Sequence, residues 1–338
     1  MKLTFVGTGS AFCMDNYQTN MLISRNGRNL LIDAGGDIRF GLKEIGMGYK
    51  DINSIYVTHC HADHIGGLEW FAFCTYFDPT VIEKIELIGN NKLVRELWDN
   101  CLKGGLKSIQ GYQPRLHDYF DLVQVRENRK FDWEGITFEI VQSIHIMNKY
   151  AIVPSFGLMI TDPDTGKKIY YTGDTQFNPN QIRDFYDEAD LIIQDCETSP
   201  FKSGVHANYS ELRSDELSPE IRAKMLLQHY QDNVLDVPDN PYVYVKKDLN
   251  GIYEILGEAL NAAREECDEL ISHAKCRIFD LMETGLGEPT IKLKDEWNEK
   301  AKADGFMVIP NAPFLFDSYG FIPKGLELDT VQLFEPSG

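Results

Sequence analysis

Residues 59–64 read His-Cys-His-Ala-Asp-His, and this run constrains the fold more than any other feature of the chain. It directly follows Ser54–Thr58, a β-branched and aromatic stretch that predicts a buried strand. Imidazole and carboxylate are the ligands that divalent zinc, manganese and iron prefer. His59 and His61 project from the same side of an extended chain, whereas the last polar residues of the run lie in the following turn. The run therefore predicts two neighbouring metal positions at the end of a strand, in preference to a solvated polar loop.

The cysteines and the N-terminus bear on the compartment. Cys60 stands inside the run but points away from its neighbours, so we interpret it as a buried residue and not as a ligand. The 7 cysteines have no regular spacing, and no secretory signal precedes the first predicted strand. Free thiols and a cytoplasmic location are expected. No apolar run approaches the roughly 20 residues that span a bilayer, so no membrane partner is expected.

The charge of the chain limits its partners. With 338 residues, of which 43% are hydrophobic, the chain can bury a large core. Its formal net charge is −19, and no cluster of lysine and arginine stands out. Proteins that grip a long nucleic acid usually present a basic face. The composition therefore disfavours a long nucleic acid as the substrate without excluding it.

Many short strands with helices between them predict two packed sheets with helices outside. The predicted strands are Leu3–Val6, Met21–Ser24, Asn29–Asp33, Ser54–Thr58, Lys84–Ile88, Ile136–Val141, Phe156–Thr161, Lys168–Thr172 and Leu191–Gln194. Helical periodicity appears at Ile38–Ile45, Asn91–Cys101 and Pro219–Leu227. We expect residues 1–230 to form the core domain.

The texture of the sequence changes after residue 230. Residues 249–282 have apolar residues at helical spacing and acidic residues on the other face, which predicts a helical segment. We expect 231–304 to be an acidic helical insertion that packs on its own domain, covers the site as a lid or forms a homodimer. Residues 305–338 are expected to return to the core.

Three further residues extend the metal-ligand set. His145 follows a predicted strand, Asp174 ends another, and His229 ends an apolar run. Alone, each residue is more often structural. Together with the run at 59–64, they form the edge of a metal site.

The run at 59–64, followed along the chain by His145, Asp174 and His229, resembles the metal-ligand motif of the metallo-β-lactamase superfamily. Phe5–Ala11, Thr19-Asn20 and Leu31–Gly35 are similar to motifs of its phosphodiesterase and ribonuclease Z branch. The resemblance covers roughly residues 1–230 and returns near 306–325. It implies an α+β fold, an αββα sandwich of two sheets flanked by helices, with the C-terminal helical segment added.

The resemblance also implies a ligand set for two divalent ions. His59, His61 and His145 would hold one ion, and Asp63, His64 and His229 would hold the second, with Asp174 between them. Zinc is the first choice, with manganese and iron as alternatives, because the ligand types suit all three. Asp63 is also a candidate to accept the proton of the nucleophile.

A second histidine favours a phosphorus substrate. In the phosphodiesterase branch, an acidic residue and a histidine ahead of the last ligand lie beside the leaving group. Glu197 and His206 are similar to these two, with Glu197 orienting His206 as an acid. The alternative is that His206 is only a loop residue.

The predicted function is hydrolysis of a small phosphodiester, a cyclic nucleotide or a cyclic ribose phosphate. Relatives that process tRNA carry a long basic arm between the third histidine ligand and the bridging aspartate, whereas only residues 146–173 separate these positions here. A ribonuclease Z-like endonuclease that processes tRNA 3′ ends remains the alternative, and a non-catalytic binding scaffold is a further one. Nearby aromatic residues can stack a base or belong to the core; they are Tyr17, Trp70, Phe71, Phe73, Tyr76 and Phe77.

Overall fold

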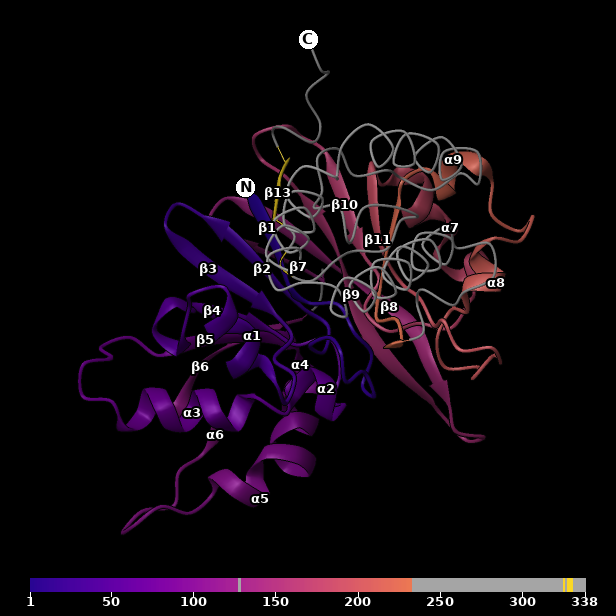
Figure 1. Cartoon of the computed structure of the whole chain (residues 1–338). Coiled ribbons are helices and arrows are strands. Elements are labelled where there is room, and N and C mark those ends of the chain that lie inside the picture. The colour runs from indigo at the N-terminus through magenta and orange to yellow at the C-terminus, as the bar shows by residue number, and fades with distance from the viewer. Residues whose placement is uncertain (127–128, 233–324, 326, 331–338) are drawn as a thin grey trace, which may run out of the picture.

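The computed structural model describes residues 1–126, 129–232, 325 and 327–330. Two sheets face each other in this part of the chain, with helices on the outer faces (Figure 1). The first sheet has the spatial order β13 (Glu327–Asp329), β1 (Lys2–Gly7), β2 (Asn20–Arg25), β3 (Arg28–Ile32), β4 (Ser54–Tyr56), β5 (Ile85–Asn90) and β6 (Phe120–Val125). The second has the order β12 (Met225–Gln228), β11 (Leu191–Asp195), β10 (Lys168–Tyr171), β9 (Ile152–Thr161), β8 (Ile136–Met147) and β7 (Lys130–Trp133).

The helices divide between the two sheets. Those beside the first sheet are α1 (Ile38–Glu44), α2 (Ala62–Ile65), α3 (Leu68–Phe77), α4 (Asn91–Glu96), α5 (Lys103–Leu106) and α6 (Leu116–Tyr119), with the short turns η1 (Tyr49–Asp51) and η2 (Leu97–Leu102). Those beside the second sheet are α7 (Pro179–Glu188), α8 (Tyr209–Leu212) and α9 (Pro219–Arg222). The predicted αββα sandwich is confirmed.

Alternation along the strands explains the layers. In β10, Ile169 and Tyr171 belong to the core between the sheets, whereas Tyr170 packs with Ile182 and Tyr186 of α7 on the other face. Successive side chains of a strand point to opposite faces, so a strand that is covered on both sides becomes apolar throughout. The continuous apolar runs in the sequence thus reflect burial on both faces.

Parallel pairing places the C-terminal ends of several neighbouring strands at the same end of each sheet. β10 pairs in parallel with β11, and β11 in parallel with β12. In the first sheet, β3 pairs in parallel with β4. Polar residues that follow these strands in the sequence therefore meet at the same end of the sandwich.

One predicted helix is wrong. Residues 219–227 form only the short helix α9, after which Met225–Gln228 is the strand β12. Ser218 caps α9, but all four residues of β12, three apolar ones and Gln228, are buried beside β11, where an extended chain completes the sheet. His229 therefore follows a strand.

Of the predictions for the chain after residue 232, only those that concern residues 325 and 327–330 can be compared with the structure. β13 pairs antiparallel with β1, through Lys2 and Asp329 among others. The predicted helical segment at 249–282 lies outside the described residues, so the division at residues 230 and 304 stays a prediction. Among the described residues, no helix is long and apolar enough to cross a membrane.

Candidate metal centre

The candidate centre lies where the two sheets meet at one end of the sandwich. His59 follows β4 of the first sheet, and His61 directly precedes the first residue of α2. His145 lies in β8, beside an irregularity in its pairing with β9. Asp174 and His229 follow the parallel strands β10 and β12. Seven residues from both sheets therefore converge, as the sequence predicted from the motif and the order of its residues.

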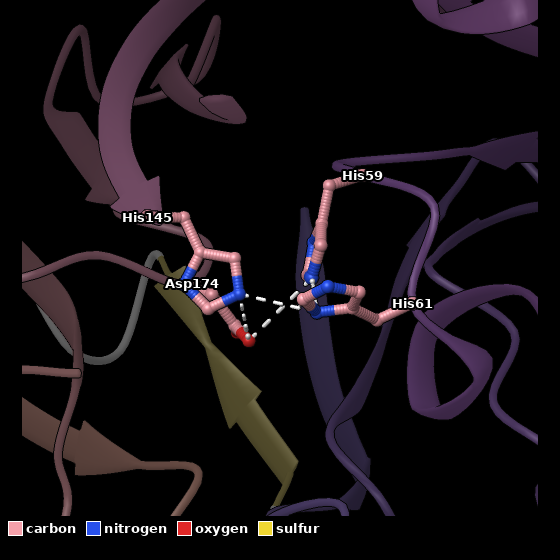
Figure 2. Close-up of side chains that lie close together, drawn as sticks. All are labelled: His59, His61, His145 and Asp174. Atoms are coloured by element: carbon pink, nitrogen blue, oxygen red, sulfur yellow. Dashed lines mark hydrogen bonds and ion pairs between the residues drawn. The ribbon is translucent and has the colours of Figure 1, made fainter. Parts of the chain in front are cut away.

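A first cluster gathers three imidazoles around one carboxylate (Figure 2). Nε2 of His59 lies 2.9 Å from Nδ1 of His61, which lies 3.1 Å from Nε2 of His145. Oδ2 of Asp174 lies 3.6 Å from Nε2 of His59 and 3.7 Å from Nε2 of His145. Ring nitrogens at these separations point their ligand atoms toward a common position.

A second cluster shares the same carboxylate oxygen. Oδ2 of Asp174 lies 3.3 Å from Nε2 of His64 and 3.6 Å from Nε2 of His229. Oδ2 of Asp63 lies 3.2 Å from each of these two nitrogens. Asp174 is 3% exposed and joins the two clusters.

The contacts of the ring nitrogens that face away from the clusters show that these histidines fit metal ions. Nδ1 of His145 lies 2.9 Å from the carbonyl oxygen of Val205, so it donates there and leaves Nε2 with a lone pair. Nδ1 of His59 lies 3.0 Å from Oγ1 of Thr58, whose hydroxyl donates to Asp33. Histidines that bind metals in proteins almost always donate their other N–H in this way.

His64 gives a second test of the fit. Its Nδ1 lies 2.7 Å from Oδ2 of Asp33, and its buried Nε2 has no hydrogen-bond partner among the described residues. Burial lowers the pKa of His64, but the carboxylates of Asp174, Asp33 and Asp63 outweigh it and raise this pKa well above its usual value. The second cluster therefore has an excess of buried negative charge, which favours a cation.

In the first cluster, by contrast with His64, the pKa values of the histidines are lowered. Burial lowers the pKa values of His59, His61 and His145, and the neighbouring imidazoles lower them further, so these rings are neutral. The pKa of Asp174 lies well below its usual value, because the attraction of the surrounding histidines, first of all His229, outweighs its burial. Neutral imidazoles and an ionised carboxylate are the protonation states that ligands require.

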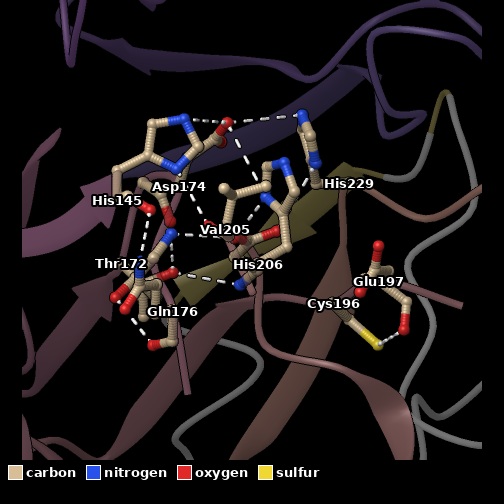
Figure 3. A network of polar contacts seen from close by, with 12 residues as sticks. His145, Thr172, Asp174, Gln176, Cys196, Glu197, Val205, His206 and His229 are labelled. Carbon is tan, nitrogen blue, oxygen red and sulfur yellow. Dashed lines mark hydrogen bonds and ion pairs between the residues drawn. The ribbon is translucent and has the colours of Figure 1, made fainter. Parts of the chain in front are cut away.

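His206 lies at the edge of both clusters, between the rings of His145 and His229 (Figure 3). Its Nδ1 lies 2.8 Å from Oδ2 of Asp195. Burial lowers the pKa of His206, but the attraction of Asp195 and the hydrogen bond to it raise the pKa to about 9. His206 is therefore protonated at neutral pH.

The predicted partner of His206 is wrong. Glu197 accepts from the backbone N–H of Ser203 at 2.9 Å, and its side chain lies apart from His206 (Figure 3). Asp195 ends β11, where its carboxylate turns into the site, whereas Glu197 lies two residues further and stabilises the loop that carries His206. The sequence segment was identified, but the wrong acid within it was chosen.

Two positioning residues were missed as members of the site. Asp33 and Asp195 are fully buried and bind the outer nitrogens of His64 and His206. Both stand at the ends of predicted strands, which is the signal that identified Asp174. Cys60 belongs to neither cluster, but it is half-buried and not buried as predicted; its partial burial raises the pKa of its thiol.

Comparisons with known proteins show the family to which the chain belongs. The family model described as "Anti-Pycsar protein Apyc1" matches residues 1–245. Similar relatives carry the same description, among them one from Bacillus phage 010DV004 that is 36% identical over 248 residues, 70% of this chain and 91% of that protein. Another, from Paenibacillus xerothermodurans, is 33% identical over 237 residues, 69% and 89% of the two chains.

A solved structure shows the same fold. The metallo-β-lactamase fold protein YhfI from Bacillus subtilis superposes with a TM-score of 0.52 at 18% identity, over 68% of this chain and 87% of that one. This likeness shows that the chain has the metallo-β-lactamase fold, and its paired clusters of histidine and aspartate lie at one end of that fold. The chain belongs to the anti-Pycsar protein Apyc1 family.

Proposed function

We propose that this chain is a metal-dependent phosphodiesterase that hydrolyses a cyclic nucleotide, and that it acts against Pycsar as the names of its relatives state. The observation that carries the proposal is the pair of adjoining clusters that share Oδ2 of Asp174, with protonated His206 at their edge. Two-metal sites with this ligand chemistry suit in-line displacement at phosphorus.

The seven predicted ligands would hold two divalent ions, and zinc is the proposed metal. The first ion would lie among His59, His61 and His145, and the second among Asp63, His64 and His229, with Asp174 contacting both. When bound, the ions would supply Lewis acidity that lowers the pKa of water and polarises phosphoryl oxygens.

The chain's own residues would move the protons. An oxygen from water bonds to phosphorus while one ester P–O bond breaks, so the attacking oxygen must lose a proton and the leaving oxygen must gain one. Asp63 would accept the first proton, and Nε2 of His206 would donate the second while Asp195 holds Nδ1. General acid–base steps of this kind contribute about 10²–10⁴-fold to a rate.

The connection between His145 and Asp174 supports a small substrate. The end of β8, the strands β9 and β10 and their turns fill it. The antiparallel pairing of β8 with β9 and of β9 with β10 leaves no segment for an RNA-binding arm there. The net charge of −19 agrees with a small substrate.

The test compares substrates on one preparation. The full chain, loaded with zinc or manganese, is given a panel of 3′,5′-cyclic and 2′,3′-cyclic nucleotides beside a tRNA precursor. We expect cleavage of at least one cyclic nucleotide, loss of activity with EDTA and recovery on adding metal. Cleavage of the precursor alone would mean that the ribonuclease alternative is right, and inactivity on every substrate would support the binding scaffold.

A further inference from the structure

A cavity of about 470 Å³ opens beside His59 and His61, and His206 is not part of its lining. The rest of its lining comes from Cys60, from α4, from Gln142 of β8 and from the start of β9. Pockets for small molecules occupy about 300–1,000 Å³ and are mostly apolar with a few polar groups. The cavity has this size and this composition, and it adjoins the first cluster directly.

One wall of the cavity is apolar and firmly anchored. It consists of Ile152, Val153, Pro154 and Phe156 of β9. The backbone N–H of Phe156 donates to the carbonyl of Thr58 at 3.0 Å, one residue before His59. The carbonyl of Phe156 accepts from the hydroxyl of Tyr56 at 2.9 Å. These two contacts hold Phe156, at one end of this wall, beside the segment that leads to His59.

The part of the lining that comes from α4 presents one cation and one anion. Lys92 and Glu96 stand one helical turn apart on α4, and both are exposed. Among the described residues, neither side chain forms an ion pair, so the ammonium and the carboxylate are available to a ligand. Lys92 is the cation of this lining, in a chain whose net charge is −19.

We propose that this cavity is the nucleoside subsite: it takes the base and sugar of the cyclic nucleotide whose phosphate lies between the two clusters. The inference rests on the proposed function. A base has apolar faces, which fit against Val153 and Phe156, and an edge of donors and acceptors, which fits Lys92 and Glu96. None of the aromatic residues considered from the sequence is part of the cavity lining. Phe71 is buried in the core, and Trp70 packs against that core.

The main test fills the cavity without touching the clusters. Ile152 is 45% exposed, so the fold should accept Ile152→Trp, whose indole would occupy the space of a base. Turnover is measured on cyclic nucleotides and on trimethylene phosphate, a six-membered cyclic phosphodiester without a base. We expect kcat/KM for the cyclic nucleotides to fall at least tenfold while that for trimethylene phosphate is unchanged. Ile82→Trp, at a remote and 96% exposed position, is the matched control.

A second variant uses binding as the readout. Lys92→Ala should weaken binding of the phosphorothioate of the best-cleaved cyclic nucleotide about tenfold in calorimetry with the metal-loaded full chain, because a charged hydrogen bond is lost. Arg95→Ala removes a cation from the same helix outside the cavity and should leave the affinity unchanged.

The outcomes separate the two proposals. If the unsubstituted chain cleaves neither substrate, both the proposed function and this inference are wrong. If the unsubstituted chain cleaves cyclic nucleotides but Ile152→Trp slows both substrates equally or neither, the proposed function stands and the subsite is overturned. Equal affinities of the Lys92→Ala and Arg95→Ala variants would also overturn it.

Discussion

Nδ1 of His64 lies 2.7 Å from Oδ2 of Asp33, and this contact decides which ring nitrogen faces the second cluster. Asp33 is fully buried, and it adopts a left-handed backbone conformation with φ of 63°. Asp33→Asn should weaken metal binding about 10–100-fold, since partners of this kind orient the ligating imidazole and raise its basicity. Titration of the metal-free protein with zinc against a chromophoric chelator measures the change.

A buried aspartate outside the site provides the control for this prediction. Asp162 is equally covered but accepts hydrogen bonds from the turn at Asp164 and Thr165. Asp162→Asn should keep the zinc affinity of the unsubstituted chain. Equal losses in the two variants would show that burial of a carboxylate, not its contact with His64, sets the affinity.

His206 is predicted to act on the substrate and not to hold metal. His206→Ala should lower kcat for a cyclic nucleotide about 10²–10⁴-fold with metal content unchanged, because it removes the proposed proton donor. Glu197→Gln should have a much smaller effect, since Glu197 bonds to the backbone of Ser203. Metal analysis and steady-state kinetics check both variants, and loss of metal from His206→Ala would make His206 a ligand.

The candidate metal ligands could be predicted from the sequence, whereas the carboxylates that bind their outward-facing ring nitrogens were missed. The run at 59–64 is recognisable because its residues are adjacent in the sequence, so residue types alone predict metal binding. Asp33 and Asp195 act through space on His64 and His206, across 31 and 11 positions of the chain. In the segment that holds both Asp195 and Glu197, the position at the end of the strand is the signal that favours Asp195, as it does for Asp174.

At the scale of elements, three parallel strands deliver three site residues. Asp174, Asp195 and His229 stand at the ends of β10, β11 and β12. The close approach of β9 to β10 depends on Gly157, where an added Cβ would lie 2.4 Å from the carbonyl oxygen of Tyr171 and 2.5 Å from that of Thr172. These neighbours are backbone atoms, so the strands would have to separate.

Gly157→Ala should therefore lower the free energy of unfolding by about 1–3 kcal/mol, the usual cost of overpacking. It should also weaken metal binding, because β10 positions Asp174. Denaturant unfolding and zinc titration measure the two effects. Gly104→Ala is the control: nothing lies within 4 Å of the added Cβ, and alanine in the helix α5 should be neutral or slightly stabilising.

The strands with long apolar runs were predictable from the sequence, and the short or mixed elements were not. The helix predicted at Pro219–Leu227 is wrong because its apolar half completes a sheet. β6 was missed, since only its two end residues are buried and its interior, Asp-Leu-Val-Gln, mixes polar and apolar residues. Strands that are buried on both faces can thus be predicted from their continuous apolar runs, and edge strands lack such runs.

At the scale of the whole molecule, the two clusters connect the two sheets. His59 and Asp63 come from the first sheet and its helix α2, whereas His145, Asp174 and His229 come from the second. Without metal, these sheets meet across ionised carboxylates and histidines that are removed from water, an arrangement that costs free energy. Bound cations would offset that cost and tie the sheets together, so metal should stabilise the entire fold and not only the site.

Metal removal should therefore lower the thermal unfolding midpoint of the chain. A ligand at 100 times its dissociation constant stabilises a fold by about 2.7 kcal/mol, which corresponds to a shift of about 5–10 °C in a domain of this size. Scanning calorimetry of the zinc-loaded chain, before and after EDTA, measures the shift. Asp174→Ala, which removes the carboxylate common to both clusters, should give a midpoint that responds far less to EDTA. An equal response in both proteins would place the stabilising metal at another site, and no response in the unsubstituted chain would contradict the coupling of metal to the fold.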